Sequence, residues 1–263
     1  INIIQTGSIN IRILVIGGNG FIGKHVVNHA LDLGWMVTSL NVSDNLSLPH
    51  ANLEYIQADI TNITSLKKAL GLAEFEYVVN CGGYIDHTLF SKGGRQVLEM
   101  HFIGVINLVE LLNRDTLKSF INIGSSDEYG DVNAPQSELQ RENPISPYSL
   151  GKVSATHFLQ MLFRTEKFPV TILRLFLTYG PGQNSNRFIP QIISGCLKDI
   201  SFPVSKGEQL RDFCFIDDVI RAIFLVFDSS KSAGEIINIA SGKPVSIRYV
   251  IENIQNIIEH VNK

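Results

Sequence analysis

A tyrosine and a lysine in the segment SPYSLGK could transfer a proton together. Tyr148 and Lys152 are four residues apart, so on a helix their side chains would share one face. An ammonium group beside a phenol favours the ionised form, and this spacing predicts that Lys152 lowers the pKa of Tyr148. Such a tyrosine can exchange a proton with a hydroxyl near neutral pH. Taken alone, however, the pair more often marks an ordinary solvated helix face.

The segment GSSDEYG places small hydroxyls upstream of this pair. Ser125 follows the apolar run 120–123, which is typical of a buried parallel strand. In open α/β sheets the chemistry collects at the carboxyl ends of strands, so Ser125 could hydrogen-bond the oxygen that the tyrosine protonates. Ser126 is a candidate for contact with a substrate, although a hydroxyl at this point could equally satisfy a turn.

Three glycines in VIGGNGFIG have the spacing of a dinucleotide-binding turn. Gly17, Gly20 and Gly23 lie between a predicted strand and a predicted helix, the context that gives this motif its meaning. The glycines permit an unusual φ, a close approach of backbone amides to a pyrophosphate, and tight packing of the helix on the sheet. The amides at the helix start, including those of Phe21 and Ile22, would attract phosphate. A glycine turn selected for packing alone is the alternative.

The residue that would bind the adenosine ribose is Asn41, at the end of the second predicted strand. An acid is expected there, about 20 residues after the glycines. Asparagine can hydrogen-bond a ribose but does not repel a 2′-phosphate, and no arginine follows to bind that phosphate. The cofactor is therefore NAD or NADP, with a slight preference for NADP. Asp44 is more simply a loop-capping residue, though it could substitute for Asn41.

The next two strands end in further candidates for cofactor contact. Asp59 of QADIT could contact an adenine amino group with Ile60 against the ring, or it could cap the following helix. The fourth strand ends without bulky side chains, so the backbone could pass close to the cofactor at Cys81, Gly82 and Gly83.

Apolar strands alternate with helical periodicity along most of the chain. Strands are predicted at 11–16, 36–40, 54–57, 77–80, 120–123 and 170–176, and helices at 21–33, 64–70, 97–112 and 148–163. This alternation predicts an α/β fold, a doubly wound parallel sheet of the Rossmann type. The later segments alternate irregularly: 189–197, 212–215, 217–227, 236–239 and 247–258. We therefore predict a dinucleotide-binding domain over 1–178 and a smaller substrate-binding lobe over 179–263, interleaved with it.

Composition restricts the partners. The net charge is −3 and no stripe of Lys and Arg is present, which favours small molecules over nucleic acid. Three cysteines without metal-ligand spacing support neither a disulfide framework nor a metal site. The longest apolar stretch, 222–227, is far shorter than the roughly 20 residues of a membrane-spanning helix. No basic leader opens the chain, so we expect a cytoplasmic protein, although the missing initial Met suggests that some leading residues are absent.

Taken together, these motifs resemble the extended short-chain dehydrogenase/reductase family, which includes nucleotide-sugar epimerases, dehydratases and reductases. The resemblance covers residues 11–258 and is carried by VIGGNGFIG, QADIT, GSSDEYGD, SPYSLGK, ILRLFLTYGPGQ and GEQLRDFCFIDDV. It implies an NAD(P) cofactor, a sugar linked to a nucleoside diphosphate, and oxidation or reduction at C4 of the hexose.

The resemblance also implies a role for each matching residue. Tyr148 would be the acid/base, Lys152 would position the nicotinamide ribose and lower the pKa of the tyrosine, and Ser125 would bind the reacting oxygen. Arg211 matches an arginine that binds the substrate diphosphate, where a bidentate guanidinium suits phosphate geometry. The alternative for Arg211 is a surface ion pair with a neighbouring acid. Arg187 is a further candidate for substrate binding.

Three departures from the family pattern bear on the activity. Leu177 stands where asparagine is common, so one polar contact to substrate is missing. Asp127 stands where dehydratases have a glutamate; it could still act as a catalytic acid or base, so dehydration is less favoured but stays open. The chain also ends early for this family, so a C-terminal segment could be missing from the sequence.

The leading hypothesis is an NAD(P)-dependent 4-epimerase or 4-keto-6-deoxysugar reductase acting on a nucleotide-diphosphate sugar. A nucleotide-sugar 4,6-dehydratase is the third possibility. A catalytically silent NAD(P)-binding regulator is the alternative from another class. Retention of Tyr148, Lys152 and Ser125 argues against the regulator, because an inactive site need keep none of them.

Two helices carry apolar residues beyond the face that a core would cover. The helix at 97–112 contributes Phe102 and Val105, and the helix at 148–163 contributes Phe158 and Met161. In the family that the chain resembles, these two helices pair between subunits. We therefore expect a homodimer.

Overall fold

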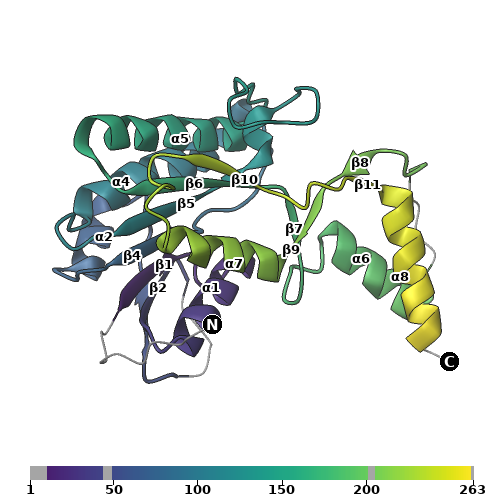
Figure 1. The fold of residues 1–263 in the computed structure, drawn as a ribbon, viewed down its shortest axis with the longest axis horizontal. Helices are drawn as coiled ribbons and strands as arrows, with labels where there is room; N and C mark the ends of the chain where they lie inside the picture. The colour runs from purple at the N-terminus through teal and green to yellow at the C-terminus, as the bar shows by residue number, and fades with distance from the viewer. Residues whose placement is uncertain (1–10, 44–48, 201–204, 262–263) are drawn as a thin grey trace.

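The computed structural model describes residues 11–43, 49–200 and 205–261 (Figure 1). A broad sheet covered by helices forms the larger part, and a smaller group of helices and short strands projects from one side. The described residues begin with the strand that precedes helix α1 (Phe21–Asp32) and end in helix α8 (Ile247–Val261), within the projecting part.

Seven strands form one parallel sheet in the order β10-β6-β5-β4-β1-β2-β3. They are β1 (Arg12–Ile16), β2 (Met36–Asn41), β3 (Leu53–Gln57), β4 (Tyr77–Asn80), β5 (Ser119–Ser125), β6 (Val170–Leu175) and β10 (Ile236–Ile239). The chain proceeds outward from β1 to β3 and then resumes at β4, on the other side of β1. Ligands of open α/β sheets bind at the carboxyl ends of the strands at such a reversal. The predicted doubly wound Rossmann fold is confirmed.

Each face of the sheet has its own hydrophobic core, because alternate residues of a strand point to opposite faces. From β1, Ile13 and Val15 pack in one core with helices α1 and α7 (Ile216–Phe227). Leu14 and Ile16 pack in the other, under helices α2 (Ile63–Leu70), α4 (Gly104–Leu111) and α5 (Pro147–Glu166). A strand buried on both sides must be apolar throughout, which explains the unbroken apolar runs in the sequence.

The helix predicted at 97–112 is interrupted. It consists of α3 (Gly94–Leu98), a π-helical turn η2 (Glu99–Ile103) and α4. The wider turn contains His101, which is buried. Single π-turns inside α-helices frequently occur at functional sites. Two short 3₁₀ helices complete this part of the chain: η1 (Phe90–Lys92) and η3 (Ser126–Tyr129).

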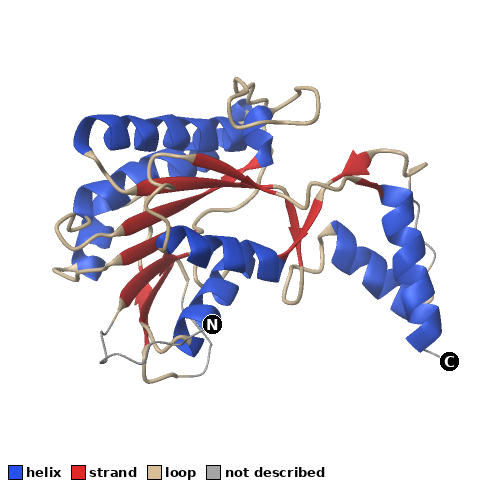
Figure 2. Ribbon diagram, viewed as in Figure 1, coloured by secondary structure: helices blue, strands red, loops and turns tan. Residues whose placement is uncertain are grey.

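The projecting lobe is built from two small sheets and two helices (Figure 2). Strand β7 (Leu177–Tyr179) pairs with β9 (Phe213–Phe215), and β8 (Leu210–Arg211) pairs with β11 (Val245–Ser246). Helix α6 (Phe188–Leu197) packs against α8. Between these pieces the chain returns to the large sheet twice, as α7 and β10. A domain boundary at residue 178 stays a prediction.

No helix in the three described ranges is long and apolar enough to cross a membrane. The same ranges contain no cluster of three or more His, Cys, Asp or Glu residues that could hold a metal ion. All three cysteines are free thiols.

Candidate functional site

The glycine turn lies between β1 and α1, at the carboxyl edge of the sheet. Gly17 adopts φ +73°, a left-handed conformation that favours glycine, and its amide donates to the Leu40 carbonyl at 2.8 Å. A Cβ on Gly23 would lie 2.1 Å from the Gly17 carbonyl oxygen, so that position tolerates no side chain without movement of the turn. The sequence-based assignment of tight packing to these glycines agrees with this geometry.

The first turn of α1 has the properties of a phosphate cradle. Its N-cap, Gly20, provides no side-chain hydrogen bond to the amides that follow, and the turn contains no acidic residue. The amides of Phe21 and Ile22 belong to this uncapped end, where a helix attracts negative charge. The residues therefore fit the pyrophosphate of a dinucleotide.

The side chain of Asn41 stabilises the glycine turn through hydrogen bonds. Its side-chain oxygen accepts from the Asn19 amide at 2.8 Å, and its amide nitrogen donates to Ser39 Oγ at 3.0 Å. The side chain is buried, so these contacts already use the oxygen that a ribose would need. Asn41 holds the loop in shape, and its contact with a ribose stays a prediction. Asp44 lies outside the described residues.

Asp59 and Ile60 differ in exposure. One oxygen of the exposed Asp59 carboxylate accepts from the amide and the hydroxyl of Thr61, at 2.8 and 2.7 Å. The N-cap of α2 is instead Asn62, so the interpretation of Asp59 as that cap is wrong. Ile60 is buried in the core, and its Cδ1 atom lies 2.6 Å from the point where a Cβ on Gly104 would be. Contact of either residue with adenine stays a prediction.

The end of β4 passes beside the glycine turn. The Cys81 amide donates to the Ile16 carbonyl at 3.0 Å, and a Cβ on Gly17 would lie 3.0 Å from the Cys81 carbonyl oxygen. Gly83 has φ +101°, and a Cβ there would collide with the His101 ring at 2.2 Å. Small residues are therefore required here by neighbouring protein atoms. Cofactor contact by Cys81, Gly82 and Gly83 stays a prediction.

Helix α5 presents Tyr148 at its first turn, because a capping box determines where the helix begins. Ser146 Oγ accepts from the Ser149 amide at 3.1 Å, and Ser149 Oγ accepts from the Ser146 amide at 3.0 Å. Pro147 then takes the first helical position. The tyrosine lies near the end of β5, where the Ser125 side chain is close enough to lower the pKa of the phenol. The structure thus brings Ser125 and Tyr148 together, two of the four residues predicted to be catalytic.

Burial dominates the ionisation of Tyr148, whose exposure is 5%. Burial raises its pKa to about 12, and the carboxylates of Asp127 and Glu128 act in the same direction. The polar side chain of Ser125 and the charge of Arg187 lower the pKa by smaller amounts. The predicted lowering of this pKa is therefore wrong for the chain alone, since removal of the phenol from water outweighs the favourable charges.

Lys152 shares the face of α5 that carries Tyr148 but reaches past the ring. Its ammonium nitrogen donates to the Ile123 carbonyl at 2.6 Å and lies 6.0 Å from the centre of the Tyr148 ring. Burial lowers the pKa of Lys152 to about 8, against the charge of Glu128, which raises it. A lysine in this environment is close to the point at which it can release its proton near neutral pH.

A buried ion pair behind β5 holds Ser125 in place, and the sequence did not reveal it. Glu128 Oε1 accepts from the Ser125 amide at 2.9 Å, while Oε2 accepts from Arg174 Nε at 3.0 Å. Both side chains are 0% exposed. Arg174 also donates to Glu142 at 2.6 Å and lies over the Tyr129 ring. These residues are too far apart in the chain to form a recognisable sequence motif. They come into contact only because β5 packs against β6.

Two histidines near Tyr148 were also missed. The His101 ring lies edge-on to the Tyr148 ring at 4.9 Å, and its Nε2 donates to the Tyr84 carbonyl at 2.9 Å. Burial lowers the pKa of His101 to about 3, so it stays neutral. His87 lies edge-on at 5.7 Å, with its Nε2 3.6 Å from the Asp127 carboxylate. Single histidines with no repeat or metal spacing carry no signal in sequence.

The predicted substrate residues lie at two places. Arg187, at the start of α6, is close enough for its charge to affect Tyr148. Arg211 lies exposed on β8 and donates to the neighbouring Leu210 carbonyl at 2.8 Å. The Asp212 carboxylate accepts from Ser241 and Gly242, so no Arg211–Asp212 ion pair forms. Ser126 begins η3 beside Ser125, and substrate contact by these residues stays a prediction.

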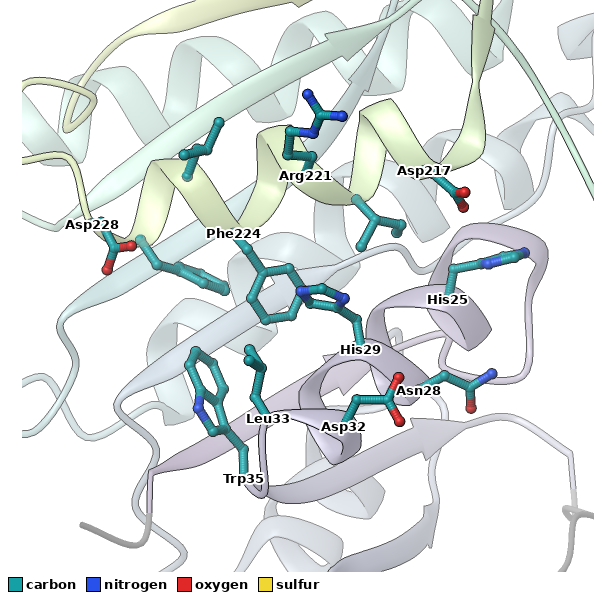
Figure 3. A pocket seen from close by; sticks show the side chains of 13 residues that line it. His25, Asn28, His29, Asp32, Leu33, Trp35, Asp217, Arg221, Phe224 and Asp228 are labelled. Atoms are coloured by element: carbon teal, nitrogen blue, oxygen red, sulfur yellow. The ribbon is translucent and has the colours of Figure 1, made fainter. Parts of the chain in front are cut away.

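A hollow of about 650 Å³ between α1 and α7 lies apart from this group (Figure 3). Aromatic side chains line it, with Trp35 and Phe224 at 5.5 Å between ring centres and Phe227 nearby. Among the described residues, those that line this hollow do not include Tyr148, Ser125 or Lys152. The candidate catalytic residues therefore lie at the carboxyl edge of the sheet and not in this hollow.

The sheet order, the glycine turn and the convergence of a serine, a tyrosine and a lysine define the extended short-chain dehydrogenase/reductase class. Comparison with known proteins gives the family. Residues 13–240 match the model of the NAD dependent epimerase/dehydratase family, and the chain belongs to that family.

The named relatives are of two kinds, 4,6-dehydratases and 4-epimerases. The dTDP-glucose 4,6-dehydratase of Haemophilus influenzae is 25% identical over 95% of this chain and 80% of its own length. A putative UDP-glucose 4-epimerase of Methanocaldococcus jannaschii is 28% identical over 93% of this chain and 81% of its own length. The UDP-glucuronic acid 4-epimerase of Bacillus cereus, solved with UDP-glucuronic acid and NAD, superposes with a TM-score of 0.81 at 25% identity, covering 95% of this chain and 83% of that one. The protein is thus an enzyme of the nucleotide-sugar epimerase/dehydratase type.

Proposed function

We propose that this protein oxidises and reduces C4 of a hexose linked to a nucleoside diphosphate, with NAD as its cofactor. The observation that carries the proposal is the proximity of Ser125 to Tyr148 at the end of β5, with Lys152 on the same helix face as the tyrosine. Relatives that bind UDP-sugars and NAD support the choice of substrate and cofactor.

The glycine turn and the uncapped start of α1 would hold the cofactor pyrophosphate. NAD supplies a hydride acceptor, and in its reduced form a hydride donor, when it is bound. The side chain of Asn41 is neutral and is hydrogen-bonded to Asn19 and Ser39, so it offers no positive charge to a 2′-phosphate. This arrangement, together with the family, favours NAD over NADP.

The chain's own residues handle the proton and the substrate oxygen. Tyr148 Oη would accept the proton of the C4 hydroxyl during oxidation and return it during reduction. Ser125 would donate a hydrogen bond to the same oxygen, since its Oγ is fixed by accepting from the Asp127 amide at 3.1 Å. Because burial raises the Tyr148 pKa, a nearby positive charge is needed before the phenol can act as a base. Arg187, whose charge lowers the Tyr148 pKa, and the protonated Lys152, 6.0 Å from the centre of the Tyr148 ring, could supply it.

Two outcomes of this chemistry are a 4-epimerase, which regenerates its cofactor, and a 4-keto-6-deoxysugar reductase, which consumes it. A 4,6-dehydratase is the second candidate, because Asp127 lies close enough to raise the pKa of Tyr148 and several relatives have that name. Arg187 and Arg211 would bind the diphosphate between the sheet and the lobe, through bidentate contacts.

The first test is incubation of the purified protein with NAD and with UDP-, dTDP-, GDP- and CDP-hexoses. Epimerisation without net change in cofactor absorbance identifies a 4-epimerase. Stoichiometric oxidation of reduced cofactor by a 4-ketosugar identifies a reductase, and a 4-keto-6-deoxy product identifies a dehydratase. Binding of NAD without turnover of any sugar would contradict the proposal and favour the regulator.

A homodimer through α4 and α5 accompanies this proposal. Phe102 of the turn η2, which precedes α4, forms an edge-on pair with Phe158 of α5 at 6.3 Å, and Ile103 of η2 and Met161 of α5 expose apolar surface. Val105, predicted for the same seam, is buried in the core of the single chain and is not available to a partner. Light scattering at micromolar concentration tests the dimer, and a monomer would refute it. The cytoplasmic location stays a prediction.

A further inference from the structure

The hollow between α1 and α7 is a candidate binding site that the proposed chemistry does not use (Figure 3). Trp35, which lines it, comes directly before β2, and Tyr77, which stacks on Trp35, begins β4. The amino ends of parallel strands lie at one edge of a sheet, so this part of the hollow is at the edge opposite to Ser125 and Tyr148. Its volume of about 650 Å³ suits a small organic molecule.

Aromatic side chains form one end of the hollow. Trp35 lies 5.5 Å from Phe224 and 6.0 Å from Phe227 between ring centres, with the ring planes inclined at 51° and 41°. Tyr77 stacks on the indole at 5.1 Å and so supports it from behind. The three lining rings are half-buried, which leaves part of each accessible from the hollow. The face of an aromatic ring is negative and attracts a cation, most strongly in tryptophan.

Three exposed aspartates line the same hollow: Asp32 of α1, Asp217 at the start of α7 and Asp228 at its end. Within the ranges that the structure describes, none of them forms an ion pair with another side chain. Arg221 also lines the hollow, but it has a partner of its own, Asp218, at 3.8 Å. The lining therefore has an excess of negative charge.

Two histidines complete the polar lining. His25 Nε2 lies 2.9 Å from the Pro181 carbonyl oxygen, and the His29 ring packs edge-on against Phe224 at 4.4 Å between centres. Figure 3 shows His25 and Asp217 at the end of the hollow that is farther from Trp35. The aromatic end and this polar end are thus chemically distinct.

Both flanking helices end beside the aromatic rings. Helix α1 ends at Asp32, and α7 ends at Phe227 with Asp228 as its C-cap and no basic residue in its last turn. The free carbonyls at a helix C-terminus carry partial negative charge and favour a cation. Burial, and then the Asp228 carboxylate, raises the pKa of Tyr77, which indicates that this charge lies close to the stacked rings.

From these surroundings we infer that the hollow binds a small organic cation, a protonated or quaternary amine attached to an apolar body. The apolar body would lie along Leu33 and the aromatic rings, and the positive charge would lie near Asp32 and Asp228. An anion would instead meet three carboxylates and the negative ends of two helices. The inference goes beyond the proposed function, because no residue of the Ser125–Tyr148 site takes part in it.

The chain contains a single tryptophan, Trp35, so intrinsic tryptophan fluorescence reports directly on this hollow. The test titrates the whole chain with benzyltrimethylammonium at about pH 8, where a histidine of ordinary pKa is neutral. Benzyl alcohol and phenyl phosphate are the neutral and anionic comparisons, since they keep the ring and change the charge. We expect a saturable change in Trp35 emission, with the cation bound at least about tenfold more tightly than either comparison.

Charge-removing variants test the proposed contacts. Asp32→Asn and Asp228→Asn should each weaken binding of benzyltrimethylammonium about two- to fivefold, the effect of one exposed ion pair, and benzyl alcohol should bind as before. Phe224→Leu keeps an apolar side chain but removes a ring face, so affinity for the cation should fall by about threefold or more. The two surface aspartate variants cover the case in which Phe224→Leu folds poorly, as judged by its melting temperature.

Glu252→Gln is the matched control. Glu252 is an exposed carboxylate on α8 in the projecting lobe, and it does not line the hollow. Its substitution removes the same charge from the chain without changing the local field, so affinity for the cation should equal that of wild type. An equal loss in Glu252→Gln and Asp228→Asn would show that only the net charge matters, and would overturn the site.

Other outcomes also decide the inference. Equal binding of benzyl alcohol, tighter binding of phenyl phosphate, or no saturable change with any probe would overturn it. Tighter binding of a lysine-rich peptide than of the small cation would assign the hollow to a protein partner instead. A change in Trp35 emission on dilution without any probe would assign it to contact between two copies of the chain. Turnover of a nucleotide sugar is measured separately, and its presence or absence leaves each of these results unchanged.

Discussion

Glu128→Gln removes the negative charge from the most buried ion pair near the site. The substitution keeps the size of the side chain, and the amide oxygen can still accept from the Ser125 amide. The amide nitrogen, however, would then face Arg174 Nε and the Thr156 hydroxyl, which donates to Glu128 at 2.8 Å. Arg174 would lose the carboxylate that compensates its buried charge and keep only Glu142.

The expected cost follows from burial. Both partners are 0% exposed, and loss of one partner of a buried ion pair costs about 3–5 kcal/mol. At roughly 2–4 °C for each kcal/mol in a chain of this size, the melting temperature should fall by about 6–20 °C. Because Glu128 also fixes the Ser125 backbone, turnover should fall in the fraction that remains folded.

Urea unfolding, followed by circular dichroism, measures the free energy change. Glu166→Gln is the matched control: Glu166 pairs with Arg114 at the surface, where the partners are 45% and 42% exposed. An exposed pair is worth about 0–1 kcal/mol, so this control should stay near wild type. Glu128→Leu combined with Arg174→Met should recover part of the loss, because it removes both of the fully buried charges, while Glu142 keeps His157 at 3.3 Å. Equal losses of unfolding free energy in Glu128→Gln and Glu166→Gln would show that burial of the ion pair does not determine the cost.

Three shorter predictions concern the site. Tyr148→Phe should keep NAD affinity, measured by calorimetry, and lower turnover by about 10²- to 10⁴-fold, so near-normal turnover would remove Tyr148 from the mechanism. The pKa of Lys152 is about 8 in the folded protein, below the ordinary lysine value of 10.5, so between these values the unfolded chain binds more protons. The stability of wild type relative to Lys152→Met should therefore rise with pH from 8 to 9.5 in urea melts, and a flat or falling difference would contradict the shift. Gly23→Ala would place a Cβ 2.1 Å from the Gly17 carbonyl oxygen, so NAD affinity should fall by more than tenfold; unchanged affinity would show that the turn does not bind the cofactor.

The sequence predicted the fold well because the signals for it are local. The apolar runs of β1, β2, β4 and β5 are buried on both faces, and their boundaries agree with the structure to within one or two residues. The chief error was the helix at 97–112. A π-turn differs from an α-turn by one hydrogen-bond step, which leaves the apolar periodicity almost unchanged.

For the site, the sequence by itself determined which chemical groups are available and on which elements they lie. Helical spacing put Tyr148 and Lys152 on one face, and the strand pattern put Ser125 at a carboxyl end. Their energetics required the tertiary structure, since burial reversed the expected direction of the Tyr148 pKa.

The positions of the remaining groups near the site depend on the packing of segments that are distant in the chain. Glu128 meets Arg174 across β5 and β6, and His87 meets Asp127 across the ends of β4 and β5. No periodicity of the sequence connects such residues, because their separation along the chain depends on the lengths of the intervening helices and loops. Sequence thus determines local geometry and chemistry, while the solvent exposure and the partners of each group arise when the sheet assembles.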